Sequence, residues 1–204
     1  YPTIPRLITE DGFVVGQAVL KKMLAKVMFA MASNDQRPVL NGCYFRVSDD
    51  ELLMVSCDSY KLARCATKAA IENKNEDGSA LKFSFIIPTK TVNELYKLLK
   101  DDERETVRIY LTRRTIVFNI GSMVFFSRLI DGEFISYQRI IPAGWKTRVK
   151  VNCDQFAGCI ERASLIAREG KNNLIRIEVS GGKMIVTSNS EIGDSYDEME
   201  VETD

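Results

Sequence analysis

The chain has 204 residues and a formal net charge of zero, and its 45% hydrophobic and 27% charged residues are the balance of a globular protein. The absence of histidine removes the usual general base at neutral pH and the most frequent metal ligand, which counts against an enzyme. Five cysteines without a C-x-x-C spacing argue against a disulfide framework or a zinc site, and no apolar run approaches the ~20 residues that span a bilayer. These features predict a cytoplasmic protein with no metal or other cofactor and no membrane partner.

The neutral total conceals an uneven charge distribution. Residues 191–204 hold seven acidic side chains and no basic one, which leaves 28 basic and 21 acidic side chains in residues 1–190. This basic excess keeps nucleic acid among the candidate partners.

A β-α-β-β-β pattern opens the chain. The apolar residues 13–15 predict a short strand, and a helical periodicity follows from Gln17 to Ala32. Three strands are predicted next, over 42–47, 52–57 and 60–67, with Asp49-Asp50 and Asp58-Ser59 as the turns between them.

The same pattern recurs twice. The second copy has a strand over 83–87, a helix from Thr89 to Lys100 with Thr91 and Glu94 spaced as a capping box, and strands over 107–111, 116–120 and 123–129. The third has a strand over 148–151, a helix over 154–167, and strands over 174–179, 184–188 and 195–201. Three copies of one unit predict an α+β fold with helices packed on antiparallel sheets.

The first two helices each have an apolar face and a polar face. The polar faces are mostly basic, and comprise Gln17, Lys21, Lys22, Ala25 and Lys26 in the first helix and Lys90, Asn93, Glu94, Lys97 and Lys100 in the second. Lysines without base-reading neighbours suit salt-dependent contacts to phosphates, although a solvated surface is the simpler interpretation of one such helix. Phe29 also falls on the polar side of the first helix, where the pattern does not explain it.

The polar stretch Asp58-Ser59-Tyr60-Lys61 allows three interpretations. It can be a tight turn, one wall of a binding groove, or a Ser-Lys pair acting in hydrolysis without histidine. Neighbouring side chains in a turn point apart, and no G-x-S-x-G sequence marks an oxyanion hole, so the hydrolase is the weakest of the three.

Several segments together resemble the bacterial DNA polymerase III beta subunit, the sliding-clamp family. RPVLNGCYFRV (37–47) followed by SCDSYKLARC (56–65) carries the resemblance most clearly. FSFIIPTKTVNELYKLL (83–99), FFSRLIDGEFISYQRIIP (125–142) and RASLIAREGKNNLIRIEV (162–179) are similar to three further segments in the same order. The similarity extends over essentially the whole chain.

The resemblance implies a DNA-clamp fold, in which each domain consists of two β-α-β-β-β units. A subunit of the family has three domains, and two subunits close into a ring with helices lining the hole and sheets outside. It implies that residues 1–8 link to a first domain outside this chain, 9–142 form the middle domain, and 143–204 form the first half of the third domain. We therefore expect a homodimer for the full-length protein and a monomer for this fragment.

The resemblance also implies a function without catalysis. A clamp encircles double-stranded DNA and tethers the polymerase III alpha subunit, the clamp loader and other proteins that carry clamp-binding peptides. The alternatives are a basic nucleic-acid-binding module that forms no ring, and the Ser/Lys hydrolase.

The helix faces and the resemblance together predict three groups of site residues. DNA contacts are predicted for Lys21, Lys22, Lys26, Asn34, Arg37, Lys90, Lys97 and Lys100. The resemblance implies a peptide groove that includes Leu40, Cys57, Ser59, Tyr60, Lys61, Leu62, Ile135, Arg139 and Ile140, with Leu40, Leu62 and Ile140 offering apolar contact. It places Leu165 and Ile166 at the subunit interface. Cys57 and Ile135 stand where many clamps have Thr and Pro, which leaves the peptide preference open.

Overall fold

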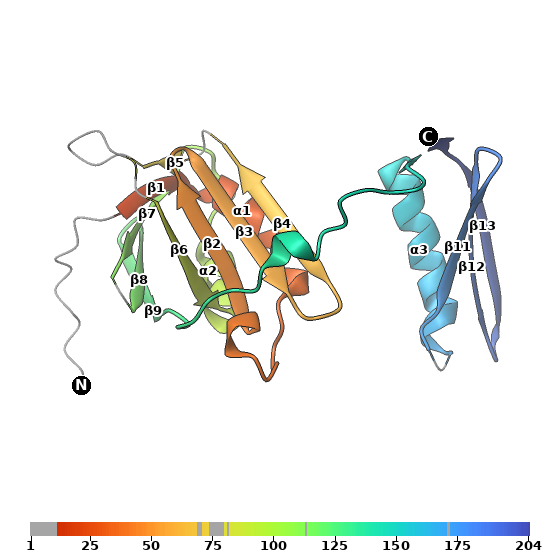
Figure 1. Cartoon of the computed structure of the whole chain (residues 1–204), viewed down its shortest axis with the longest axis horizontal. Helices are drawn as coiled ribbons and strands as arrows, with labels where there is room; N and C mark the ends of the chain where they lie inside the picture. The colour runs from red at the N-terminus through yellow and green to blue at the C-terminus, as the bar shows by residue number, and fades with distance from the viewer. Residues whose placement is uncertain (1–11, 69–70, 74–79, 81, 113, 171) are drawn as a thin grey trace. The chain divides into compact units, whose positions relative to one another are not determined.

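The structure is a computed structural model that describes residues 12–68, 71–73, 80, 82–112, 114–170 and 172–204 (Figure 1). The predicted linker over residues 1–8 lies outside the described residues. The chain divides into two compact units, with the division between Ser136 and Tyr137.

The first unit contains two β-α-β-β-β repeats. Its elements are β1 (Gly12–Gly16), α1 (Gln17–Val27), β2 (Gly42–Ser48), β3 (Glu51–Cys57), β4 (Leu62–Thr67), β5 (Ile71–Glu72), β6 (Phe83–Pro88), α2 (Thr89–Leu98), β7 (Thr106–Leu111), β8 (Thr115–Ile120) and β9 (Met123–Arg128). Short 3-10 turns cover Met28–Ala30 and Pro38–Leu40. The predicted repetition is confirmed for this unit.

The two repeats exchange their first strands. The antiparallel sheets have the orders β4-β3-β2-β6 and β5-β1-β7-β8-β9, so β6 of the second repeat pairs with β2 and β1 of the first pairs with β7. Phe85 lies opposite Phe45, and their rings stack with centroids 5.2 Å apart. Because each repeat completes the sheet of the other, the two repeats share one core.

Helices α1 and α2 lie against the sheets and fill that core (Figure 1). Leu20 and Leu24 of α1 and Leu95 of α2 are fully buried, as are Phe45 and Phe118 of the strands. Burial of each such side chain contributes about 1.5–3 kcal/mol of hydrophobic free energy, so the apolar helix faces bind the helices to the sheets. The opposite faces remain at the surface.

The second unit contains one repeat. Its elements are β10 (Val149–Lys150), α3 (Cys153–Arg168), β11 (Ile175–Ser180), β12 (Lys183–Ser190), β13 (Gly193–Glu200) and β14 (Glu202–Thr203), after a 3-10 turn at Tyr137–Arg139. Strands β11, β12 and β13 form an antiparallel sheet under α3, and β10 pairs with β14. No strand within the described residues pairs with the free edge of β11, whereas β6 occupies the equivalent edge of β2.

Helix α1 ends earlier than predicted. It stops at Val27 rather than Ala32, passes into a 3-10 turn, and Met31 is already extended with ψ of 137°. The hydroxyl of Ser56 on β3 donates a hydrogen bond to the carbonyl of Val27 and so satisfies one of the last free carbonyls of the helix. Residue Ala32 instead joins the following loop, where its N–H donates to the carbonyl of Leu40.

The polar face of α1 was wrongly predicted to include Gln17. This side chain is fully buried: its Nε2 donates to the carbonyl of Thr106 over 3.1 Å, and its Oε1 accepts from the N–H of Lys100 over 3.0 Å. The second contact holds the chain just after α2, which ends at Leu98 rather than at Lys100. Gln17 therefore joins the start of the first repeat to the second.

The predicted capping box on α2 is also wrong. Pro88 precedes the helix, no side chain caps its first turn, and Thr91 is buried with its Oγ1 2.6 Å from the hydroxyl of Ser127. The threonine hydroxyl thus bonds to β9 rather than to the helix end.

Candidate functional site

Two lysines lie fully on the solvent side of α1. Lys22 and Lys26 are exposed, and they form no ion pair with any described residue. Lys21 differs, because only 22% of its side chain is exposed. Its Nζ lies 3.5 Å from the Asp101 carboxylate and 5.6 Å from the centre of the Tyr96 ring, so part of its charge is used within the unit.

The two lysines of α2, and Lys100 just after its end, divide in the same way. Lys97 pairs with Glu94 over 3.0 Å and Lys100 with Glu105 over 3.4 Å. Lys90 is exposed and has no acidic partner in the described part of the chain. Exposed ion pairs contribute little stability, yet the nearby carboxylates weaken the field outside. The free positive charge of the two helices is therefore concentrated at Lys22, Lys26 and Lys90.

The loop after α1 is fixed by a residue that was not predicted. The side chain of Asn41 accepts the N–H of Asp35 over 2.7 Å and donates to its carbonyl over 2.8 Å. The Asp35 carboxylate accepts the N–H of Arg37 over 2.9 Å and its Nε over 3.1 Å. The short Asp-x-Arg spacing was the available signal for this turn. Asn34, between the α1 end and this cluster, is exposed.

Arg37 also connects this loop to the turn between β3 and β4. Its Nη2 donates to the Ser59 hydroxyl, and that hydroxyl lies 3.3 Å from the Asp35 carboxylate. Ser59 has a φ of +77°, an uncommon backbone conformation for a residue with a side chain. Arg37, predicted as a DNA contact, and Ser59, predicted in the peptide groove, are therefore parts of one network.

We predict that the Asp35 carboxyl titrates far below an ordinary aspartate. The Arg37 side chain and then its backbone N–H hold the pKa of Asp35 at about 2. Because the folded-state pKa is lowered, the contribution to stability is complete above the unfolded pKa of about 3.9 and is lost as the pH falls through about 2. NMR titration of the carboxyl carbon should give a midpoint near 2 in the wild type and a higher one in Arg37→Ala. Equal midpoints near 3.9 would contradict the network.

The turn between β3 and β4 is stabilised by Asp58. Its carboxylate accepts the N–H groups of Tyr60 and Lys61 over 3.0 and 2.8 Å, and it pairs with the Lys61 ammonium over 2.8 Å. These bonds explain why β4 begins at Leu62 and not at residue 60 as predicted. Lys61 contacts Asp58 and Ser59 contacts Arg37 and Asp35, so the Ser59–Lys61 pair that a hydrolase would need is not formed.

The residues predicted for the peptide groove differ in exposure. Tyr60 is 96% exposed, Lys61 is exposed and Leu62 is half-buried. Leu40 was expected to offer apolar contact, but it is fully buried, and Cys57 is nearly so. Both side chains belong to the interior of the protein. Leu40 is the buried residue of the 3-10 turn Pro38–Leu40, and Cys57 is the buried last residue of β3.

The remaining predicted residues lie in the connector and in the second unit. Ile135 is half-buried, and Arg139 and Ile140 in and after the 3-10 turn are exposed. Leu165 is exposed near the end of α3, whereas its neighbour Ile166 is half-buried.

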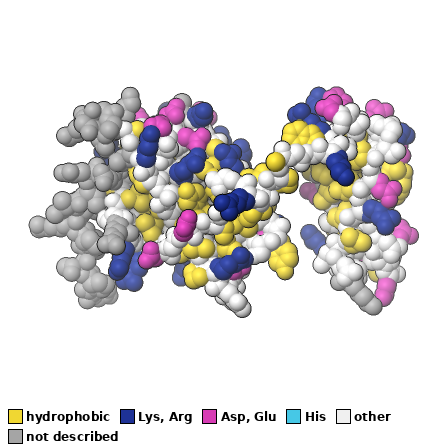
Figure 2. All heavy atoms as spheres, in the orientation of Figure 1, with side chains coloured by type: hydrophobic (Ala, Val, Ile, Leu, Met, Phe, Trp, Pro, Cys, Tyr) yellow, Lys and Arg dark blue, Asp and Glu magenta, His cyan; other side chains and the backbone are white. Residues whose placement is uncertain are grey.

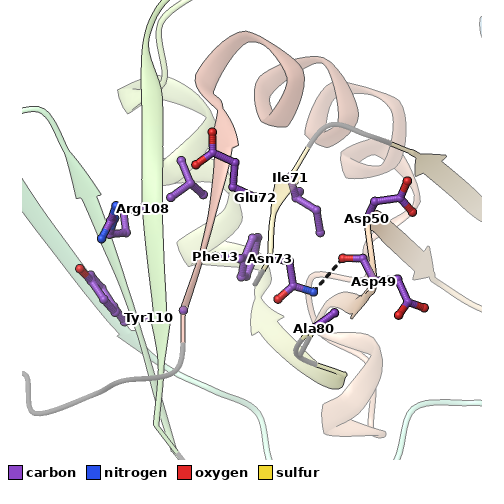
Figure 3. A pocket seen from close by; sticks show the side chains of 11 residues that line it. Phe13, Asp49, Asp50, Ile71, Glu72, Asn73, Ala80, Arg108 and Tyr110 are labelled. Carbon is purple, nitrogen blue, oxygen red and sulfur yellow. Dashed lines mark hydrogen bonds between the residues drawn. The ribbon is translucent and has the colours of Figure 1, made fainter. Parts of the chain in front are cut away.

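One cavity in the described part of the chain is lined by none of the predicted site residues. It has a volume of about 800 Å³ between β1, β5, β7 and the turn after β2, and Figure 3 shows Arg108 and Tyr110 on one side and Asp49 and Asp50 on the other. Asn73 also lines this cavity, and its side chain donates to the carbonyl of Asp49 over 2.9 Å (Figure 3). No group of acidic or cysteine side chains able to hold a metal occurs among the described residues.

The visible surface carries charges of both signs on each unit (Figure 2). Among the described helices, none is long and apolar enough to cross a membrane.

Repeats that exchange their first strands, with helices on antiparallel sheets, define a DNA-clamp fold. Residues 14–135 match the family model for the DNA polymerase III beta subunit, central domain, and residues 138–204 match the model for its C-terminal domain. The chain therefore belongs to the DNA polymerase III beta subunit family.

Individual relatives agree with this assignment. The chain is 36% identical over 195 residues to the beta sliding clamp of Bacillus subtilis, an alignment that covers 95% of this chain and 50% of the relative. It is 32% identical over 200 residues to the beta sliding clamp of Staphylococcus epidermidis, which covers 98% of this chain and 51% of that protein. The chain thus spans about half the length of the curated relatives it matches.

Solved structures show the same similarity. A putative DNA polymerase III beta subunit from Eubacterium rectale aligns with a TM-score of 0.91 and 27% identity, over 100% of this chain and 54% of the other. The sliding clamp of Bacillus subtilis aligns with a TM-score of 0.90 and 31% identity, over 100% and 53%. A Pseudomonas aeruginosa clamp bound to griselimycin aligns at 28% identity with a TM-score of 0.85, over 100% and 53%.

Proposed function

We propose that this chain acts in a processivity factor, a ring-shaped sliding clamp that encircles duplex DNA and tethers a DNA polymerase without catalysing a reaction itself. The family match over both units is the observation that carries the proposal. The geometry of the turn supports the absence of catalysis, because Ser59 and Lys61 bond to different partners. The middle domain would comprise residues 9–142, and residues 143–204 would be half of a third domain.

Enclosure explains how such a protein holds DNA without reading its sequence. A closed ring releases the duplex only by opening or by reaching an end, and the tethered polymerase rebinds intramolecularly at a high effective concentration. Lysine contacts to phosphates hold the duplex without fixing one register, which permits sliding. Lys22, Lys26 and Lys90 are the side chains best suited to this contact, because their charges are free.

The exposed turn between β3 and β4 would form one wall of a groove for short peptides of polymerases, the clamp loader and other partners. Tyr60, Lys61 and Leu62 present aromatic, cationic and aliphatic surface there. The Asp35–Arg37–Ser59 network preorganises this wall, which lowers the entropic cost of peptide binding. A few such anchors give micromolar affinity, about −8 kcal/mol, which permits exchange of partners.

The second unit supports a longer subunit that closes into a ring. The free edge of β11 is the position that β6 fills on β2, so a further β-α-β-β-β unit would complete the sheet. Leu165 would lie at the interface between two subunits of the full-length homodimer, and this chain by itself would be monomeric.

Loading on circular DNA tests the ring. The full-length protein that contains this chain, loaded on a closed circular duplex by its clamp loader, is expected to elute with the DNA at high salt and to be released when a restriction enzyme cuts the circle. Linearisation leaves every local contact intact, so release identifies enclosure. Equal retention on circular and linear DNA would identify a basic module that forms no ring.

A further inference from the structure

The sheet β5-β1-β7-β8-β9 has one buried face and one open face. Val107, Ile109, Ile116 and Phe118 are at most 1% exposed and belong to the core that α1 and α2 fill. The residues between them point the other way, because successive side chains of a strand lie on opposite faces of the sheet. The outer face of β7, β8 and β9 therefore consists of Thr106, Arg108, Tyr110, Thr115, Val117, Asn119, Val124, Phe126 and Arg128.

An apolar row crosses the middle of this outer face. Tyr110 lies opposite Val117, and Val117 lies opposite Phe126, so the three side chains stand side by side on neighbouring strands. Phe126 is 53% exposed and Tyr110 is half-buried, whereas Val117 between them is only 4% exposed. Two strand spacings, about 10 Å, separate the aromatic residues. The row thus presents two separate rings with an aliphatic floor between them.

A glycine makes room for one of the two rings. Gly12 of β1 lies opposite Tyr110, and a Cβ at this position would lie 3.0 Å from Tyr110 Cδ1 and 2.7 Å from the carbonyl oxygen of Ile109. Glycine in a strand is typical of such a close approach. The Tyr110 ring therefore lies against β1, and Arg108 lies beside it on the same strand (Figure 3).

Arginines flank the apolar row on both sides. Arg108 precedes Tyr110 by two residues on β7, and Arg128 follows Phe126 by two residues on β9, and both are exposed. Neither guanidinium forms an ion pair with a described residue. No residue of the outer face is acidic, and Glu72 of the same sheet lies two strands away from Arg108, beyond Val14. The outer face therefore carries free positive charge on either side of its rings.

Free arginines around exposed rings suit a polyanion that has flat apolar surfaces. The planar guanidinium donates paired N–H groups to phosphate oxygens, and an aromatic ring stacks on an unpaired base. Duplex DNA keeps its bases stacked on each other, so contact with the rings selects a single strand. An acidic peptide would pair with the guanidinium groups but would leave the rings without a stacking partner.

We propose that the outer face of β7, β8 and β9 binds single-stranded nucleic acid, with bases stacked on Tyr110 and Phe126 and phosphates paired with Arg108 and Arg128. This site goes beyond the proposed function, because it lies on the side of the sheet opposite α1 and α2, whose lysines would contact the duplex. Stacking and phosphate contacts tolerate any base, so the site would hold a strand without specifying its sequence.

Fluorescence anisotropy of the full-length protein with a labelled oligothymidylate of about 15 nucleotides tests the stacking. Phe126→Ala is expected to weaken binding about tenfold, because one stacked base loses its partner. Phe126→Leu, which stays apolar but is not aromatic, should weaken it nearly as much, and Phe126→Trp should keep the affinity within about twofold. Phe29→Ala is the matched control, since Phe29 is 63% exposed just after α1 and should not affect this probe.

The salt dependence tests the phosphate contacts. Arg128→Gln should lower the slope of log affinity against log salt by about 0.7 for the oligothymidylate, the contribution of one phosphate contact on a single strand. Arg104→Gln removes the same charge from an exposed arginine that already pairs with Asp102 over 3.2 Å. We expect it to lower the slope by less than about half as much.

Combined variants separate this site from the proposed clamp function. Replacing Lys22, Lys26 and Lys90 by Gln should leave the effect of Phe126→Ala on oligothymidylate binding unchanged. Phe126→Ala should in turn leave retention on closed circular duplex unchanged, which also shows that the variant is folded. Equal affinity of the wild type and Phe126→Ala for oligothymidylate, or the same dependence on Phe126 for a labelled polyglutamate peptide, would overturn the proposal. Wild-type protein that is not retained on circular DNA, but binds oligothymidylate through Phe126, would contradict the clamp function and support this site.

Discussion

Replacing Lys22, Lys26 and Lys90 together by Gln should weaken the binding of the full-length protein to linear duplex DNA and flatten its dependence on salt. Each lysine that neutralises a phosphate contributes about 0.9 to the slope of log affinity against log salt, so three removed contacts lower the slope by about 2.7. Between 50 and 200 mM salt this corresponds to a change of about 40-fold in the ratio of wild-type to variant affinity. Fluorescence anisotropy of labelled linear duplex at several salt concentrations measures the affinities and hence the slope.

The same three changes should leave retention on closed circular DNA largely intact. Enclosure does not depend on how strongly the inner wall attracts the duplex, whereas equilibrium binding to a linear fragment does. Loss of retention in parallel with affinity would show that contacts alone hold the DNA.

A matched triple variant uses the paired lysines Lys21 of α1, Lys97 of α2 and Lys100 just after α2. Replacing Lys21, Lys97 and Lys100 by Gln removes the same charge, but each of these ammonium groups already lies within 4 Å of a carboxylate, at 3.5, 3.0 and 3.4 Å. We expect this variant to lower the slope of log affinity against log salt by less than about half as much as the first triple variant does. The reason is that its lysines would contact phosphates in competition with their existing ion pairs. Equal slopes in the two variants would contradict the division into free and paired lysines.

Replacing Gln17 by Leu should destabilise the first unit by about 2–3 kcal/mol. The change leaves the carbonyl of Thr106 and the N–H of Lys100 without their side-chain partner, and leaving a buried polar group unsatisfied costs about 1–3 kcal/mol. The apolar gain of leucine offsets only part of that cost. Urea unfolding of the 204-residue chain, followed by a signal from the first unit, measures the difference.

Gln155→Leu provides the control for this substitution. Gln155 lies on α3 with an exposed side chain, and the helix uses only its backbone N–H, which donates to Asn152 over 3.0 Å. We expect a change within about 0.5 kcal/mol. An equally small change for Gln17→Leu would show that the two hydrogen bonds of the buried Gln17 side chain do not hold the repeats together.

The repetition of one unit was predictable because apolar periodicity and turn residues are local signals. Strand runs of alternating pattern and helices with one apolar face mark β-α-β-β-β three times, and the structure has these elements in that order. The exchange of β1 and β6 between repeats was not predictable, since it depends on pairings such as Phe45 with Phe85 that are distant in sequence.

Positions where a tertiary contact overrides the local pattern were predicted wrongly. Gln17 has the spacing of a solvent-facing residue, but its partners Thr106 and Lys100 lie more than 80 residues away. The end of α1 depends on Ser56 of β3, and neither helical periodicity nor propensity contains that bond. Leu40 was predicted to offer apolar contact in the groove, but it is fully buried in the fold.

In the candidate sites too, contacts between distant residues were not predictable from the local sequence pattern. Sequence places all six lysines on polar helix faces, but the acidic partners Asp101 and Glu105 lie in the segment after α2, beyond the helical pattern. The Asp35–Arg37–Ser59 network similarly joins a loop to a turn that is 22 residues away.

A cryo-EM reconstruction of the full-length protein around duplex DNA tests most directly whether lysine-bearing helices line the inside of a ring. We predict that the ammonium groups of Lys22, Lys26 and Lys90 lie within about 8 Å of phosphates, the distance over which physiological salt leaves such charges coupled. The sheets should then lie on the outer surface. Helices α1 and α2 on the outside of the particle, or DNA bound elsewhere, would contradict the account.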